Sequence, residues 1–129
     1  LEVELQDVQP LGCALWQLDV QTEQTSRASA DELLGAGTRL ADRVRYLLEP
    51  LQVQEVDRQQ SAIQLRSSPP QRQSRTVWYY EITAQNDGSW RMVRYEKAPG
   101  QRRQQVSALL TLEVLERVCQ DVVDIASLT

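Results

Sequence analysis

Six basic residues in the middle of the chain are the side chains best suited to bind a ligand. The loop at residues 67–75 leads into a predicted hairpin and the loop at 98–105 leads out of it, so both lie opposite the Asp87-Gly88 turn. The candidate ligand-binding residues near these loops are Arg66, Arg72, Arg75, Lys97, Arg102 and Arg103. Positive charges gathered at one end of a sheet create a local field that can hold phosphate or an acidic partner.

The distribution of charge along the chain also singles out this region. The formal net charge is −4. Residues 58–103 nevertheless carry eight Arg and one Lys against three acidic residues, whereas residues 1–57 carry four Arg against eleven acidic residues. A basic middle between acidic flanks indicates a binding surface, or else mutual neutralisation of the segments within the fold.

The same region is rich in aromatic residues. Five of the seven Trp and Tyr residues lie between residues 78 and 95, and a sheet with aromatic side chains beside Arg can bind single-stranded nucleic acid. The sequence has no RNP-like motif and is acidic overall, whereas nucleic-acid-binding domains are usually basic. We therefore expect a protein partner, either a second copy or another protein. Nucleic acid or another anionic ligand at the Arg-rich loops is the alternative.

The absence of histidine excludes much enzymatic chemistry. Without His there is no Ser-His-Asp triad, no Cys-His dyad and no His-ligated metal. Cys13 and Cys119 lie far apart in sequence and form no C-x-x-C motif, so we expect two free thiols, with a disulfide between them as the alternative. The glycines of Gly35-Ala36-Gly37-Thr38 complete neither a dinucleotide-binding nor a phosphate-loop motif.

Glu81 is the best-placed carboxylate for acid–base catalysis, because it lies on a predicted strand between aromatic residues. We expect Arg94 to face it across the hairpin and to keep it ionised, which makes it structural. The sequence thus favours a non-enzymatic interaction or accessory module without a metal or cofactor. A histidine-free enzyme that uses a carboxylate or Cys13 is a third interpretation.

The clearest structural signal is the hairpin at residues 75–97. Its two strands are rich in aromatic and β-branched residues, and Asp87-Gly88 is typical of a two-residue hairpin turn. That turn predicts three cross-strand pairs: Ile82 with Val93, Tyr80 with Tyr95, and Glu81 with Arg94. The predicted core face then carries Trp78, Tyr80, Ile82, Val93 and Tyr95. The opposite face carries Tyr79, Glu81, Met92 and Arg94.

Two amphipathic helices are predicted. The first covers residues 29–49, begins at a capping box formed by Ser29 and Glu32, and ends before Pro50. An i,i+4 ion pair between Arg45 and Glu49 is expected on its exposed side. The second helix covers residues 111–126 with Thr111 as its N-cap.

The remaining elements predict the fold class. Residues 51–97 form antiparallel strands, and residues 1–28 form short strands or are weakly structured. We expect a single α+β domain over residues 1–129. It has two layers: an antiparallel four-stranded meander, which a weak N-terminal strand could extend, covered on one face by the two helices. No apolar run is long enough to span a membrane. We expect a cytoplasmic location, with further residues upstream of Leu1.

Overall fold

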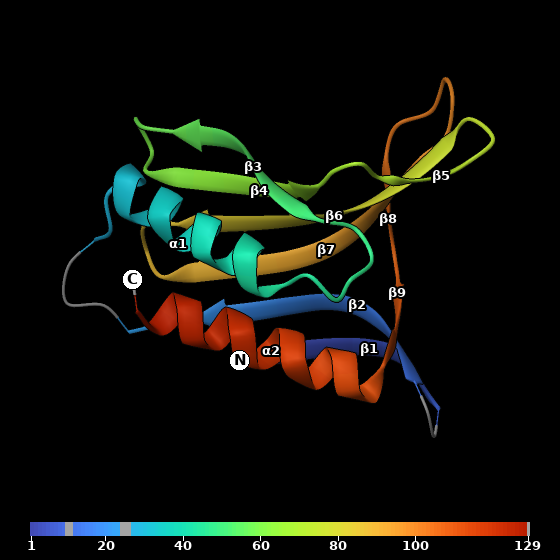
Figure 1. Cartoon of the computed structure of the whole chain (residues 1–129), viewed down its shortest axis with the longest axis horizontal. Coiled ribbons are helices and arrows are strands. Elements are labelled where there is room, and N and C mark those ends of the chain that lie inside the picture. The colour runs from blue at the N-terminus through green and yellow to red at the C-terminus, as the bar shows by residue number, and fades with distance from the viewer. Residues whose placement is uncertain (10–11, 24–26, 129) are drawn as a thin grey trace.

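The computed structural model describes residues 1–9, 12–23 and 27–128. Over these residues the chain forms nine strands and two helices (Figure 1). In chain order they are β1 (Glu2–Gln9), β2 (Gly12–Gln21), α1 (Ala30–Arg43), β3 (Leu51–Asp57), β4 (Ala62–Ser67), β5 (Gln71–Gln73), β6 (Thr76–Gln85), β7 (Ser89–Lys97), β8 (Gln104–Val106), β9 (Ala108–Thr111) and α2 (Leu112–Ser127). The α+β class expected from the sequence is confirmed.

The sheet is larger than the predicted four-stranded meander. Its strand order is β1-β2-β7-β6-β4-β3, with the short strands β5, β8 and β9 paired to β6, β7 and β2. Each recorded strand pair is antiparallel. The strands expected in the meander correspond to the neighbours β3, β4, β6 and β7, but the connection from β4 to β6 contains the additional strand β5. The weak N-terminal strand is instead a long hairpin, β1–β2, and β2 pairs with β7 in the interior of the sheet.

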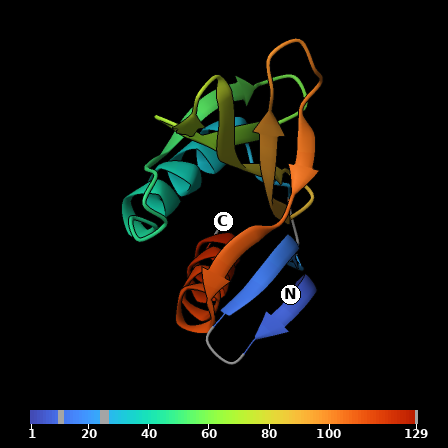
Figure 2. The same cartoon turned by 90° about the vertical axis from the view of Figure 1, so that its right-hand side faces the viewer.

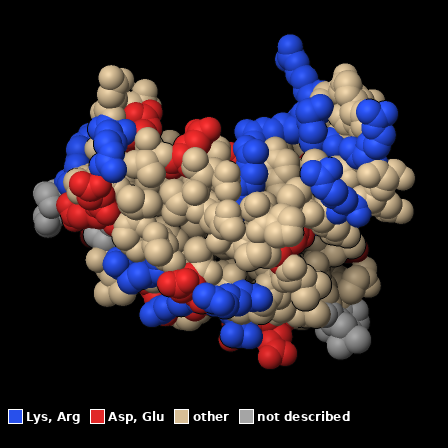
Figure 3. Space-filling view, turned by 45° about the horizontal axis from the view of Figure 1, so that its top comes forward, with Lys and Arg blue, Asp and Glu red and all other residues tan. Residues whose placement is uncertain are grey.

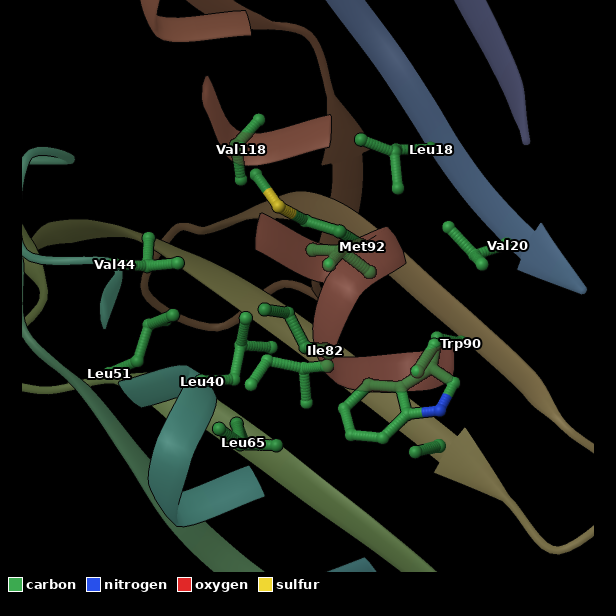
Figure 4. Close-up of a cluster of buried hydrophobic side chains, with 14 of the residues drawn as sticks. Leu18, Val20, Leu40, Val44, Leu51, Leu65, Ile82, Trp90, Met92 and Val118 are labelled. Atoms are coloured by element: carbon green, nitrogen blue, oxygen red, sulfur yellow. The ribbon is translucent and has the colours of Figure 1, made fainter. Parts of the chain in front are cut away.

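The two helices pack on the sheet and against each other. Helix α1 contacts β3 and β4, and α2 contacts β2, β9 and β7. The core between these layers is formed by large side chains from both (Figure 4). The largest fully buried ones include Trp90, Leu18, Leu33, Leu40, Leu65, Ile82, Met92 and Ile125. Burial of this apolar surface is the main force that holds the layers together.

The predicted register of the β6–β7 hairpin is wrong by one residue. Ile82 faces Met92, Tyr79 faces Tyr95 and Tyr80 faces Arg94. The turn has three residues, because β6 ends at Gln85 and β7 begins at Ser89. Gly88 has a φ of 87° and donates its backbone NH to the Gln85 carbonyl, as in three-residue hairpins that end on a glycine.

Successive side chains of a strand point to opposite sides of the sheet. The one-residue difference in register therefore places each β7 side chain on the face opposite to the predicted one. Met92 therefore lies in the core, where it is 1 % exposed, together with Tyr80 and Ile82 as expected. Val93 and Tyr95 lie on the outer face with Tyr79 and Glu81. The expected cross-strand pair of Glu81 and Arg94 is not formed, because these two side chains are on opposite faces of the sheet.

Helix α1 begins as predicted and ends earlier than predicted. Ser29 and Glu32 form the reciprocal capping box. The helix stops at Arg43, and Leu48 has a φ of 67° with 96 % of its surface exposed. This turn places Glu49 beside the sheet, so the expected Arg45–Glu49 pair is absent and Arg45 pairs with Asp42 at 3.3 Å.

Helix α2 begins after Thr111, as predicted. The Thr111 hydroxyl accepts a hydrogen bond from the Val114 NH.

Gly37 allows α1 to lie close to the sheet. A Cβ added there would be 2.6 Å from Ile63 Cδ1 and 3.3 Å from Leu65 Cδ1. At Gly35, on the same helix, an added Cβ would meet only the Arg39 guanidinium, at 3.6 Å. The two glycines are two residues apart in one helix, but only Gly37 is packed closely against the sheet.

We predict that Gly35→Ala raises the free energy of unfolding by up to about 1 kcal/mol, through the higher helix propensity of alanine. Gly37→Ala gains the same propensity but must displace Ile63, so it should be the less stable of the two proteins. Urea denaturation of both variants measures the difference. Equal stabilisation by the two substitutions would contradict close packing at Gly37.

Candidate functional site

The base of the Arg-rich region is fixed on the helix side of the sheet by a buried ion pair. Arg94 Nη2 donates to Glu49 Oε2 at 3.0 Å and to Gln71 Oε1 at 3.0 Å. Both charged side chains are about nine-tenths buried. The Arg94 guanidinium also lies 4.3 Å from the centre of the Tyr80 ring, and burial raises the pKa of the Tyr80 hydroxyl.

Ser67 extends this network into the backbone. Its hydroxyl donates to Glu49 Oε1 at 2.8 Å and accepts from the Tyr80 NH at 2.8 Å. The network therefore joins the turn after α1, the end of β4, the first residue of β5 and the middle of β7. Because Gln71 opens β5, the position of the next residue, Arg72, depends on these contacts.

A second ion pair, between Arg103 and Glu81, lies on the outer face of the sheet, and we call it and the Glu49–Arg94 pair the two anchors. Arg103 Nη1 donates to Glu81 Oε2 at 2.6 Å, and its guanidinium lies 3.9 Å from the centre of the Tyr95 ring. Burial would lower the pKa of Arg103, but the Tyr79 hydroxyl and the Glu81 charge raise it, so the guanidinium stays charged. Gln64 donates to the other oxygen of Glu81. The carboxylate, which is 4 % exposed, is thus fully engaged.

Arg66 belongs to the same outer layer. Its guanidinium lies 4.5 Å from the centre of the Tyr79 ring, and the Tyr79 and Tyr95 rings are 5.8 Å apart. The Arg66 Nε is buried without a hydrogen-bond partner. Of the six residues predicted to bind a ligand, Arg66 and Arg103 are therefore held against aromatic rings within the protein.

The other four predicted residues, Arg72, Arg75, Lys97 and Arg102, form what we call the basic end. In the register, Arg72 is opposite Val77 and Val77 is opposite Lys97, so Arg72 and Lys97 lie in one row on the outer face. Strands in a sheet are about 4.8 Å apart, which separates these two backbones by about 10 Å. Arg75 follows Ser74, whose φ of 56° makes the tight turn from β5 into β6.

Three residues of the basic end, Arg72, Arg75 and Lys97, line an open hollow of about 450 Å³. Its lining consists of Arg72, Ser74, Arg75, Val77, Lys97, Ala98 and Pro99. Arg102 is exposed on the loop that follows this lining. Figure 3 shows Lys and Arg side chains gathered at this corner of the molecule, and Figure 2 shows that the hairpins there stand clear of the β1–β2 hairpin.

Among the described residues, the four cations of the basic end lack the carboxylate partner that six of the other arginines have. Arg43, Arg58 and Arg91 each form an ion pair with a carboxylate. Within the described part of the chain, the basic end forms no such pair, and Lys97 Nζ donates only to the Ala98 carbonyl at 3.0 Å. The hollow therefore presents uncompensated positive charge.

The groups considered for catalysis are occupied or inert. Glu81, expected to face Arg94, is instead neutralised by Arg103. Cys13 and Cys119 are free, and burial raises the pKa of both thiols, which disfavours the nucleophilic thiolate. Residues 1–9, 12–23 and 27–128 hold no cluster of side chains that could bind a metal ion. Neither described helix is long and apolar enough to cross a membrane.

Comparison of the chain with protein families, with curated proteins and with solved structures finds no match. The geometry of the basic end and of the two anchors below it is therefore what indicates a function. The basic residues were predictable from the sequence, but the Glu49–Arg94 pair was not, because Glu49 was expected within a helix.

We predict that Arg94→Met lowers the free energy of unfolding by about 3–5 kcal/mol, because it leaves the Glu49 carboxylate buried without its partner. Glu49→Leu combined with Arg94→Met should lose clearly less than the sum of the two single substitutions. A double-mutant cycle in urea measures this coupling. Strictly additive losses would show that the two charges do not depend on each other.

A matched pair of substitutions tests the outer anchor. Arg103→Ala should lower the free energy of unfolding by about 1–3 kcal/mol, because Glu81 loses its charge partner in a buried position. Arg102→Ala, one residue away and exposed, should change it by less than about 0.5 kcal/mol. Thermal unfolding compares the two proteins, and an equal effect would contradict the distinction between an anchor and a free cation.

Proposed function

We propose that this protein is a non-catalytic interaction module and that its basic end docks an acidic segment of a protein partner. The observation that carries this proposal is the group of cations around the hollow that have no carboxylate partner among the described residues. An acidic segment placed there would supply the missing negative charge. Long-range attraction would also accelerate the encounter.

The outer aromatic residues favour a protein partner over single-stranded nucleic acid. Nucleic-acid binding on a sheet uses exposed aromatic faces on which bases stack. In this protein, Arg66 lies over Tyr79 and Arg103 lies over Tyr95, so each ring has a face covered by a guanidinium. The net charge of −4 would also repel a long polyanion beyond the basic end. A short acidic segment reaches the basic end without that penalty.

The anchors make the basic end suitable for docking. Arg94 and Glu49 hold β5 from the helix side, and Arg103 and Glu81 hold the loop after β7 from the outer side. The two hairpins that carry the free cations are thus positioned before a partner arrives. A preorganised surface loses less conformational entropy on binding than a mobile one.

The proposal predicts that a fluorescent ten-residue polyglutamate peptide binds the wild-type chain at ~50 mM salt and binds more weakly as salt screens the charges. Arg72→Gln combined with Arg75→Gln should weaken binding about tenfold, because two charge contacts are lost. Fluorescence anisotropy measures the dissociation constants.

Arg27→Gln combined with Arg58→Gln is the matched control. It removes the same charge at the opposite end of the sheet, where Arg27 contacts Asn86 and Arg58 contacts Asp31, and it should change binding less than about twofold. Equal weakening in both variants would overturn the assignment to the basic end. Tighter binding of an oligothymidine of equal charge would replace the proposal with the nucleic-acid alternative.

A further inference from the structure

Strand β1 leaves one long edge of the sheet open. It lies at the end of the strand order, and among the described residues its one partner strand is β2. Every residue of β1 except Val3 is exposed, including Val8, which is 58 % exposed. An open strand edge of this kind presents backbone NH and CO groups that another strand can pair with.

The edge at β1 is strongly acidic. Its eight residues include Glu2, Glu4 and Asp7 and no basic residue. None of the three carboxylates forms an ion pair with a described residue. Pairing with an identical β1 would place acidic side chains near acidic side chains, which disfavours a symmetric dimer through this edge.

Strand β5 provides an open edge of the opposite charge. It pairs with β6 on one side, and no second strand pairs with it among the described residues. All of its residues are exposed, and it carries Arg72 and leads directly to Arg75. The chain therefore contains both an acidic strand edge and a basic strand edge.

One chain cannot pair these two edges with each other. Strands β2, β7 and β6 lie between β1 and β5 in the sheet, and Figure 1 shows β1 and β5 in separate parts of the molecule. The complementary edges can meet only between copies. The other outer strand, β3, offers no substitute because its charged residues are Glu55 and Asp57.

We propose that the acidic partner of the basic end is a second copy of this chain, with β1 of one copy pairing along β5 of the next. This inference rests on the proposed function, in which the basic end docks an acidic segment. The contact uses backbone hydrogen bonds between strands together with Arg-to-carboxylate attraction. Because it joins different surfaces of the two copies, it is head-to-tail and can continue from copy to copy.

Sedimentation velocity of the full chain over a range of concentrations tests this contact. We expect concentration-dependent association at ~50 mM salt that is largely lost at ~500 mM, where the charges are screened. Arg72→Glu with Arg75→Glu should weaken association at least about tenfold, and so should Glu2→Arg with Glu4→Arg, because each pair turns attraction into repulsion.

Combining all four substitutions in one chain provides the decisive control. This variant has the wild-type net charge and again has opposite charges on the two edges, so association should return. An equimolar mixture of the two double variants should also associate, although each associates only weakly alone. Circular dichroism confirms that each variant is folded. If association is absent both in the mixture and in the chain with all four substitutions, the proposed contact between β1 and β5 is overturned.

The outcomes separate this inference from the proposed function. A wild-type chain that stays monomeric but binds polyglutamate at its basic end would overturn the contact between copies and leave the proposed function standing. A chain that stays monomeric and binds no peptide would overturn both. Salt-sensitive association that is lost in the two double variants and returns in the chain with all four substitutions would support the contact between copies.

Discussion

The buried pair of Glu49 and Arg94 is the interaction on which the organisation of this structure depends most. Two charges removed from water are stable only when each is matched and hydrogen-bonded. Here the carboxylate accepts from Arg94 and Ser67, and the guanidinium also reaches Gln71 and lies over Tyr80. These contacts require the chain to turn sharply after α1. They consequently fix where β3 begins and where β5 leaves the body of the sheet.

The arginines at and below the basic end have two distinct physical roles. Arg94, Arg103 and Arg66 use the flat face of the guanidinium against tyrosine rings, a contact that lysine reproduces less well. Arg72 and Arg75 lie on an exposed strand and turn without a carboxylate partner among the described residues. The arginines held against tyrosine rings keep the hairpins in place, and the unpaired arginines supply the positive electrostatic field of the basic end.

The sequence predicts the helix starts well, because their signals are local. Ser29 with Glu32 and Thr111 with Val114 make capping contacts over three residues. The end of α1 was not predictable in the same way. Residues 44–49 have a helical apolar pattern, and Val44 and Leu47 are indeed buried, but Glu49 is drawn out of the helix by an arginine 45 residues away in sequence. Local propensity gives way to a tertiary contact.

The candidate site was predicted as a set of residues but not as a geometry. Asp87-Gly88 indicates a hairpin, yet it fits both a two-residue turn and a three-residue turn that includes Asn86. That single residue decides whether Arg94 faces Glu81 or Glu49, because a shift of one position exchanges the faces of a strand. The division of the six basic residues into anchors and free cations follows from this register, so composition and spacing alone could not supply it.

The anchors also explain how an acidic protein can maintain a basic end. Unpaired like charges on neighbouring strands repel one another and would tend to spread the hairpins apart. The ion pairs beneath them act from both faces of the sheet, Arg94 with Glu49 on one side and Arg103 with Glu81 on the other. Each pair is internally neutral, so it adds rigidity without reducing the field of the free cations. The protein can therefore keep its positive charge concentrated and oriented while its net charge remains negative.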